Sequence, residues 1–200
     1  MDTKEKILQT ALRLFAEHGF EGVSMRDIAL EIGITKAALY RHYESKRAIF
    51  DAIVKRMEEE DGERAAACNV PEEPIAESAE PYRNTELTAL CNYTVAQFLY
   101  WTTDPFASAF RRMLTLEQYH DEEMALLYQN HLEAGSLRYT ADLLKEKMGT
   151  DEETAFQLSL EFFAPVAMLI RMSDHETDKE SLLKAVKCHM DRFVKTHFEK

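Results

Sequence analysis

The sequence predicts an all-α protein with a small N-terminal head and a larger helical body. Apolar residues recur at spacings of three and four along most of the 200 residues, which is the period of one helix face. No stretch alternates apolar and polar residues as a half-buried strand would. Candidate N-caps and terminating glycines divide the chain into segments of helix length.

The first two helices follow from an apolar stripe and a capping pattern. One helix is expected over about residues 3–18, ended by Gly19, because its apolar residues share one face: Ile7, Leu8, Ala11, Leu12, Leu14 and Phe15. A second helix is expected to begin at Ser24, since Ser24 and Asp27 have the spacing of a capping box. Gly33 is expected to end it.

The third and fourth helices are expected to begin at Thr35 and Ser45. The third turns Leu39 and Tyr43 inward, and the fourth runs through an apolar stretch as far as about residue 60. The segment 62–83 holds three of the five prolines and is expected to be a linker or loose loop. Further helices are expected over about residues 86–103, 105–119, 122–148, 151–172 and 179–198. We therefore expect two domains, residues 1–47 and 48–200.

Charge and cysteine content restrict the class of protein. The net charge is −12, yet residues 1–56 hold ten Lys and Arg against eight Asp and Glu, so the acidic excess lies in the body. An acidic body argues against nucleic acid, but a mildly cationic head does not. The charged N-terminus and the absence of a long apolar run predict no signal peptide, no membrane partner and a cytoplasmic location. Three widely spaced cysteines predict free thiols.

The second and third helices, joined by a turn at Gly33, have the form of a helix-turn-helix. Such a motif needs a second helix whose outer face can enter the major groove. With Leu39 and Tyr43 inward, the outer face consists of small, aromatic and cationic residues, namely Lys36, Ala37, Tyr40, Arg41 and His42. Arginine suits guanine, and alanine permits close approach to the base edges.

Cationic residues lie in the first turns of the third and fourth expected helices, where the helix dipole disfavours positive charge. Lys36 follows the Thr35 cap, and Lys46 and Arg47 follow the Ser45 cap, although the first turn of a helix favours acidic residues. Phosphate oxygens at these helix starts would neutralise the cations and accept hydrogen bonds from the exposed backbone N–H groups. The alternative is a three-helix bundle with a solvated charged face.

The stretch ILQTALRLFAEHGFEGVSMRDIALEIGITKAALYRHYESKRAIFDAI resembles the DNA-binding head of the TetR family of bacterial transcriptional regulators. The resemblance covers about the first quarter of the chain and includes LF-x-E-x-GF, S-x-x-DIA and LY-x-H-[FY]-x-SK. It implies DNA contacts at Arg26, Thr35, Lys36, Ala37, Tyr40, Arg41, His42 and Lys46. Members often carry Thr where this chain has Ala38, so one hydrogen bond to DNA is missing here. The resemblance implies a transcriptional repressor that binds double-stranded operator DNA.

The family's body usually dimerises through its last two long helices and encloses a small-molecule cavity among the middle ones. Here the last two expected helices are too apolar for one packing face, which predicts a homodimer. An effector of unknown identity is expected among the aromatic and Met residues of the middle helices, with Tyr93, Phe98, Trp101, Phe110, Met113 and Tyr128 as the candidate contacts. The alternative for each of these side chains is a place in the core.

Two other functions are alternatives to the regulator. An enzyme is disfavoured, because the sequence has no triad order, phosphate loop or paired catalytic carboxylates, and no cofactor motif. A helix-turn-helix protein acting through protein partners is the second alternative, for which the acidic body offers a surface. The segments 120–123 and 174–176 are rich in His, Asp and Glu, but we expect solvated charge there and no metal site.

Overall fold

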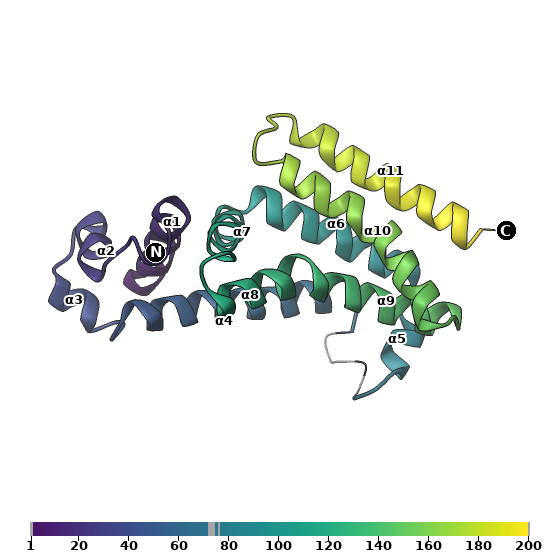
Figure 1. Ribbon diagram of the computed structural model, residues 1–200, viewed down its shortest axis with the longest axis horizontal. Coiled ribbons are helices and arrows are strands. Elements are labelled where there is room, and N and C mark those ends of the chain that lie inside the picture. Colours follow the sequence, from purple (N-terminus) through teal and green to yellow (C-terminus); the bar gives the residue numbers. More distant parts are fainter. Residues whose placement is uncertain (1, 72–74, 76, 200) are drawn as a thin grey trace. The chain divides into compact units, whose positions relative to one another are not determined.

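The computed structural model describes residues 2–71, 75 and 77–199, and these form helices joined by short connections (Figure 1). The helices of the described residues are α1 Thr3–His18, α2 Met25–Ile32, α3 Lys36–Tyr40, α4 Lys46–Ala67, α5 Glu80–Asn84, α6 Leu87–Thr103, α7 Pro105–Glu117, α8 Glu122–Leu132, α9 Ala134–Met148, α10 Glu152–Met172 and α11 Lys179–His197. The all-α prediction is confirmed.

The chain divides into two compact units. The first comprises Met1–Asp61 and Pro105–Tyr128, and the second comprises Gly62–Asp104 and Gln129–Lys200. The first unit thus combines the head with most of α4 and with α7. α7 begins more than forty residues after Asp61, where the first part of this unit ends. The domain boundary expected after residue 47 is a division by function, and it stays a prediction.

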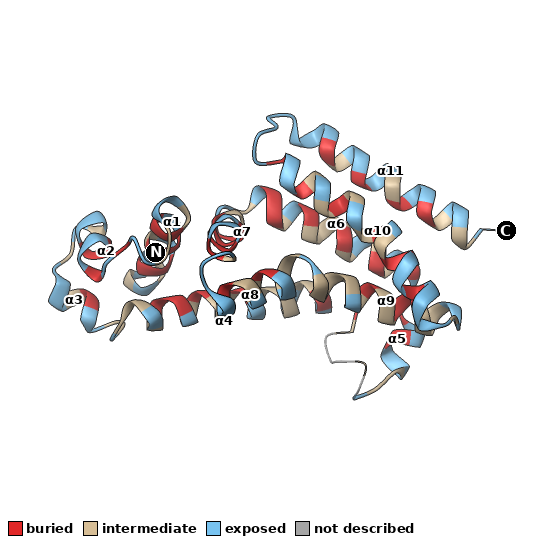
Figure 2. Ribbon diagram, viewed as in Figure 1, coloured by how far each residue is buried: buried red, intermediate tan, exposed pale blue. Residues whose placement is uncertain are grey.

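The first unit has its core where α1 packs on α2 and α7. The expected apolar stripe of α1 is buried (Figure 2). Ile7, Ala11 and Phe15 are wholly inaccessible. Phe20 follows α1 and lies edge-on against Phe15 and Phe50, at centroid distances of 5.1 and 5.4 Å. Edge-to-face aromatic pairs of this kind fix the turn after α1 against the start of α4.

The second unit is a set of packed helices in which α10 contacts α9, α11 and α6. The Ser159 hydroxyl, buried on α10, donates a hydrogen bond of 2.6 Å to the Leu137 carbonyl of α9. One turn further along α10, Phe162 meets Phe193 of α11 edge-on at 5.0 Å. One face of α10 is therefore covered within the chain.

Two expected boundaries are wrong. The helix expected over residues 122–148 is two helices, because Glu133 has non-helical torsions (φ −135°, ψ −94°). A Cβ on Gly135 would lie 1.9 Å from the Asn130 carbonyl oxygen, so the chain turns there at a closeness that only glycine permits. The linker is also shorter than expected, since α4 continues to Ala67 and α5 forms at Glu80–Asn84. Positions 72–74 and 76 of that linker lie outside the described residues.

Candidate nucleic-acid interface

The start of α2 and the turn between α2 and α3 are both fixed by local hydrogen bonds. Ser24 and Asp27 form the expected capping box, in which the Ser24 N–H donates to Asp27 Oδ2 at 2.9 Å and the Asp27 N–H donates to Ser24 Oγ at 3.3 Å. Gly33 has left-handed torsions (φ 81°, ψ 30°) and ends α2. Thr35 then caps α3 by accepting the Ala38 N–H at 3.1 Å. The helix-turn-helix geometry therefore follows from residues close in the sequence.

The face of α3 opposite the core is accessible. Leu39 is fully buried and anchors the helix, and Tyr43, which follows α3, is half-buried. Lys36, Ala37, Tyr40 and Arg41 are exposed, and the Lys36 amine lies 5.6 Å from the centre of the Tyr40 ring. A helix anchored by one apolar side chain and presenting small and cationic groups can approach a nucleic-acid groove.

The other predicted contacts of the head vary in accessibility. Arg26 on α2 is exposed, as is Thr35, whereas His42 is half-buried. The Thr35 oxygen accepts the capping bond, so its hydroxyl hydrogen remains a donor that can reach a phosphate. The roles of these three residues in DNA binding stay predictions.

Lys46 is held by the turn that follows α1. Its amine donates a hydrogen bond of 2.6 Å to the Phe20 carbonyl and lies 4.2 Å from the centre of the Phe20 ring. The exposed Glu21 carboxylate is 3.7 Å away. An ammonium has three donors, so the amine can keep the Phe20 bond and still bind a phosphate.

Arg47 already has anionic partners in the chain itself. Its Nε donates to Asp51 Oδ1 and its Nη1 to Glu123 Oε2, both at 2.6 Å, and Nη2 also contacts Glu123. These bonds raise the pKa of Arg47, the bond to Glu123 most. The sequence predicts that a phosphate neutralises Arg47. In the structure, two carboxylates of the chain itself supply the negative charge beside it. Glu123 was missed as its partner because it lies 76 positions away in the sequence.

Glu117 is the second residue of this region that the sequence did not identify. It ends α7, is buried, and accepts a hydrogen bond of 3.0 Å from the Phe20 N–H. Its contact is separated from it by 97 positions, and no local pattern predicts such a bond. The Phe20 backbone is therefore held at its N–H by α7 and at its carbonyl by Lys46.

The candidate effector contacts lie in two different units. Tyr93, Phe98 and Trp101 are on α6 in the second unit, while Phe110, Met113 and Tyr128 belong to the first. All are buried except Tyr93, which is half-buried and whose hydroxyl accepts a bond of 2.5 Å from Gln97 Nε2. The five buried side chains thus have places in packed cores, and a role in effector binding stays a prediction for all six.

Among the described residues, no group of three or more His, Cys, Asp and Glu side chains is placed to hold a metal ion. In the acidic segment before α8, Asp121 caps that helix by accepting the Met124 N–H at 3.0 Å. Glu123 is bound to Arg47. Asp121 and Glu123 thus have hydrogen-bond partners within the chain itself.

Comparison with known proteins matches the head to transcriptional regulators. Residues 7–53 match the family described as bacterial regulatory proteins, tetR family. IcaR, the negative transcriptional regulator of the biofilm operon icaADBC in Staphylococcus aureus (strain Newman), is 44% identical over 52 residues, which are 26% of this chain. The chain spans 28% of the length of that relative.

Solved structures extend the likeness to nearly the whole fold. A transcriptional regulator from Aquifex aeolicus VF5 has a TM-score of 0.68 over 96% of this chain and 99% of its own, at 18% identity. SmeT in complex with triclosan has a TM-score of 0.66 over 97% of this chain and 90% of its own, at 16% identity. SmeT represses the Stenotrophomonas maltophilia multidrug efflux pump SmeDEF. At such identities the likeness shows a common fold.

Proposed function

From the match of residues 7–53 to the tetR family of bacterial regulatory proteins, we propose that the chain is a member of that family and a cytoplasmic transcriptional repressor. It binds a pseudo-palindromic operator as a homodimer and leaves the operator when a small molecule binds its body. The named relatives are regulators of transcription.

The exposed face of α3 carries the proposal. Lys36, Ala37, Tyr40 and Arg41 are exposed while Leu39 is buried, and α2 and α3 are held at their ends by Ser24, Gly33 and Thr35. In the proposed complex Arg41 reads base edges, while Lys46 and Tyr40 contact phosphates. Arg26, Thr35, Lys36, Ala37 and His42 complete the contact set that the family resemblance implies.

The apolar surface of α10 supports the homodimer. By length and composition α10 could span a membrane, and a single such helix is weak evidence for that. Only 33% of its most apolar stretch is buried within the chain, although Phe162, Val166 and Ile170 face the core. Phe156, Met168 and Met172 remain exposed. A second copy of the helix pair α10 and α11 would cover this surface, as four-helix interfaces do.

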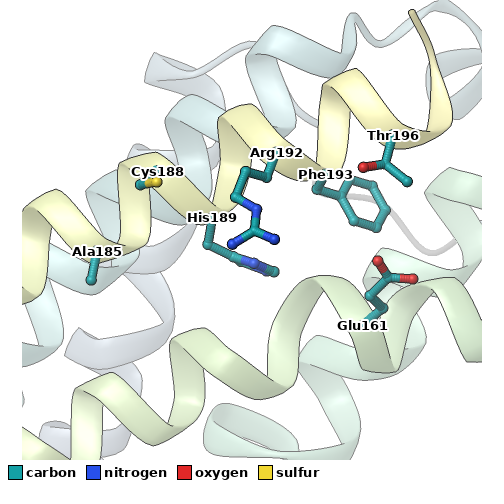
Figure 3. A pocket seen from close by; sticks show the side chains of 7 residues that line it. All are labelled: Glu161, Ala185, Cys188, His189, Arg192, Phe193 and Thr196. Carbon is teal, nitrogen blue, oxygen red and sulfur yellow. The ribbon is translucent and has the colours of Figure 1, made fainter. Parts of the chain in front are cut away.

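A shallow groove between α10 and α11 lies on the same pair of helices. It measures about 430 Å³ and is lined by Glu161, Ala185, Cys188, His189, Arg192, Phe193 and Thr196 (Figure 3). His189 bonds the Phe162 carbonyl at 2.9 Å, and His197 lies 3.1 Å from the Glu161 carboxylate, so these bonds set the spacing of the two helices. Side chains of a symmetry-related helix would fill the groove in the proposed dimer.

The effector is proposed from the aromatic and Met content of α6 to α8. The solved complex of SmeT holds triclosan, and a flat apolar molecule suits the residues proposed here: Tyr93, Phe98, Trp101, Phe110, Met113 and Tyr128. Met and aromatic side chains can rearrange around such a guest. The acidic body disfavours an anionic effector, because net negative charge repels it.

Selection from random DNA tests the function. The purified protein is incubated with a random-sequence duplex library, and bound fragments are sequenced after several rounds. We expect an inverted repeat whose half-sites lie about one helical turn, roughly 34 Å, or a multiple of it apart. Enrichment of no motif, together with binding that does not weaken as salt rises, would reject DNA recognition and favour a protein that acts through other proteins.

A further inference from the structure

Glu117 carries an acidic group where the helix itself disfavours one. It is the last residue of α7, and only 9% of it is exposed. The C-terminus of a helix is the negative end of its dipole, and a buried charge costs free energy unless hydrogen bonds compensate it. The compensation here comes from outside α7, because Glu117 Oε1 accepts the Phe20 N–H at 3.0 Å.

The turn after α1 is shaped to receive this carboxylate. Gly19 has a φ of 77°, which L side chains rarely adopt, and a Cβ built there would lie 2.6 Å from Glu117 Oε1. The backbone torsion therefore favours glycine at this position, and the absence of a Cβ leaves room for the carboxylate. The same oxygen, Glu117 Oε1, thus lies against Gly19 and accepts the N–H of Phe20.

The same turn holds the amine of Lys46. The Phe20 carbonyl accepts a hydrogen bond of 2.6 Å from Lys46 Nζ, which also lies 4.2 Å from the centre of the Phe20 ring. That ring is fixed edge-on against Phe15 and Phe50. Phe20 therefore joins the end of α7 to the cation at the start of α4.

We propose that Glu117 is a positioning residue for DNA binding. By holding the Phe20 N–H, it fixes the carbonyl that orients the Lys46 amine at the N-terminus of α4. The proposal rests on the proposed function, in which Lys46 contacts a phosphate. A movement of the end of α7 would therefore change the Lys46 contact with DNA through the turn after α1. This connection does not run along α4.

Two conservative variants separate the reach of Glu117 from its charge. Glu117→Gln keeps an oxygen at the same distance and loses the charge, whereas Glu117→Asp keeps the charge and shortens the side chain by one methylene. The probe is a duplex selected by the wild-type protein, titrated over a range of salt concentrations. Glu58 is exposed on α4, so Glu58→Gln and Glu58→Asp are the matched controls.

Glu117→Gln and both control variants should bind with the affinity and salt slope of the wild type. Glu117→Asp should lose affinity by the same factor as Lys46→Ala, and its salt slope should flatten by about one counterion for each head. The double variant Glu117→Asp, Lys46→Ala should bind like Lys46→Ala alone, because both changes remove one contact. Wild-type behaviour of Glu117→Asp, or a Gln variant as weak as the Asp variant, would overturn the proposal.

A measurement on the unmodified protein keeps the test decisive if Glu117→Asp does not fold. Hydrogen exchange at the Phe20 amide should slow when the selected duplex binds, because the phosphate contact of Lys46 and the bond to Glu117 stabilise each other. Equal exchange in free and bound protein would contradict the coupling. If the wild-type protein selects no duplex, the proposed function fails. If it selects a duplex but the Glu117 variants bind it with the same affinity and salt slope as the Glu58 controls, only this inference fails.

Discussion

Arg47 and Glu123 form an ion pair in which both Nη atoms of the guanidinium contact the carboxylate, with Nη1 2.6 Å from Oε2. The pair joins the first turn of α4 to the first turn of α8, within one compact unit. Hydrogen bonding to Arg47 lowers the pKa of Glu123. Both side chains remain about half-exposed, so solvent screens the attraction.

The first prediction concerns this ion pair. Glu123→Gln should lower the free energy of unfolding at pH 7 by about 0.5–1 kcal/mol, the range of an exposed pair with good geometry. Because the pKa of Glu123 is lower in the folded protein, its contribution is present above the ordinary pKa that this carboxyl has in the unfolded chain. It is lost as the pH falls through the folded value. Urea unfolding at about pH 7 and about pH 3 measures this.

The neighbouring Glu122→Gln is the control, because it removes the same charge from the same turn of α8. It should change the free energy of unfolding little at either pH. An equal effect of the two variants would assign the loss to general charge and not to the bond with Arg47.

The second prediction separates phosphate contacts from base contacts. Lys46→Ala should weaken binding to all duplexes by a similar factor and flatten the salt slope by about one counterion for each head. Arg41→Ala should instead reduce the discrimination between the selected duplex and a scrambled one. Titrations of both duplexes at several salt concentrations check this, and an unchanged salt slope for Lys46→Ala would reject its phosphate contact.

The third prediction uses two glycines of similar geometry. Gly33 and Gly149 both have positive φ, 81° and 62°, and a Cβ at either would meet no atom within 4 Å. Replacement by Ala should therefore cost only backbone strain, about 1–2 kcal/mol in each case. Gly33→Ala should also weaken binding to the selected duplex, because Gly33 ends α2 just before Thr35 caps the recognition helix α3. Gly149→Ala should leave DNA binding by the folded protein unchanged.

The fourth prediction tests the homodimer. Met168 is 65% exposed on α10, whereas Met148 is 37% exposed at the end of α9, outside the proposed interface. Met168→Glu should place two charges in the four-helix interface and shift the protein to monomers. Met148→Glu should leave the mass unchanged. Sedimentation equilibrium decides, and a dimeric Met168→Glu protein would place the interface elsewhere.

The fifth prediction follows from linkage between effector and DNA. An effector that releases DNA must bind the DNA-bound dimer less tightly than the free dimer, by the same factor by which it weakens DNA binding. Such factors are typically about 5 to 150-fold. Calorimetric titration of a candidate ligand into free protein and into protein on the selected duplex measures both. Equal affinities would show that the ligand does not control DNA binding.

The sequence by itself determined the head and most helix boundaries, because their signals are local. The Ser24 capping box, the left-handed Gly33 and the Thr35 cap each involve residues at most a few positions apart, and each is present as predicted. The apolar stripe of α1 likewise needed only the helical period, and it is buried. Such features depend on backbone torsions and on nearest turns, which a short stretch of sequence fixes.

The tertiary structure alone decided which distant residues meet. The Arg47 partner on α8, the Glu117 bond to Phe20 and the division of the candidate effector contacts between two units all depend on how α7 and α8 pack. The break at Glu133 depends on the close approach of Gly135 to Asn130. A charge pattern shows that Arg47 needs an anion, but packing over 76 positions determines that Glu123 supplies it.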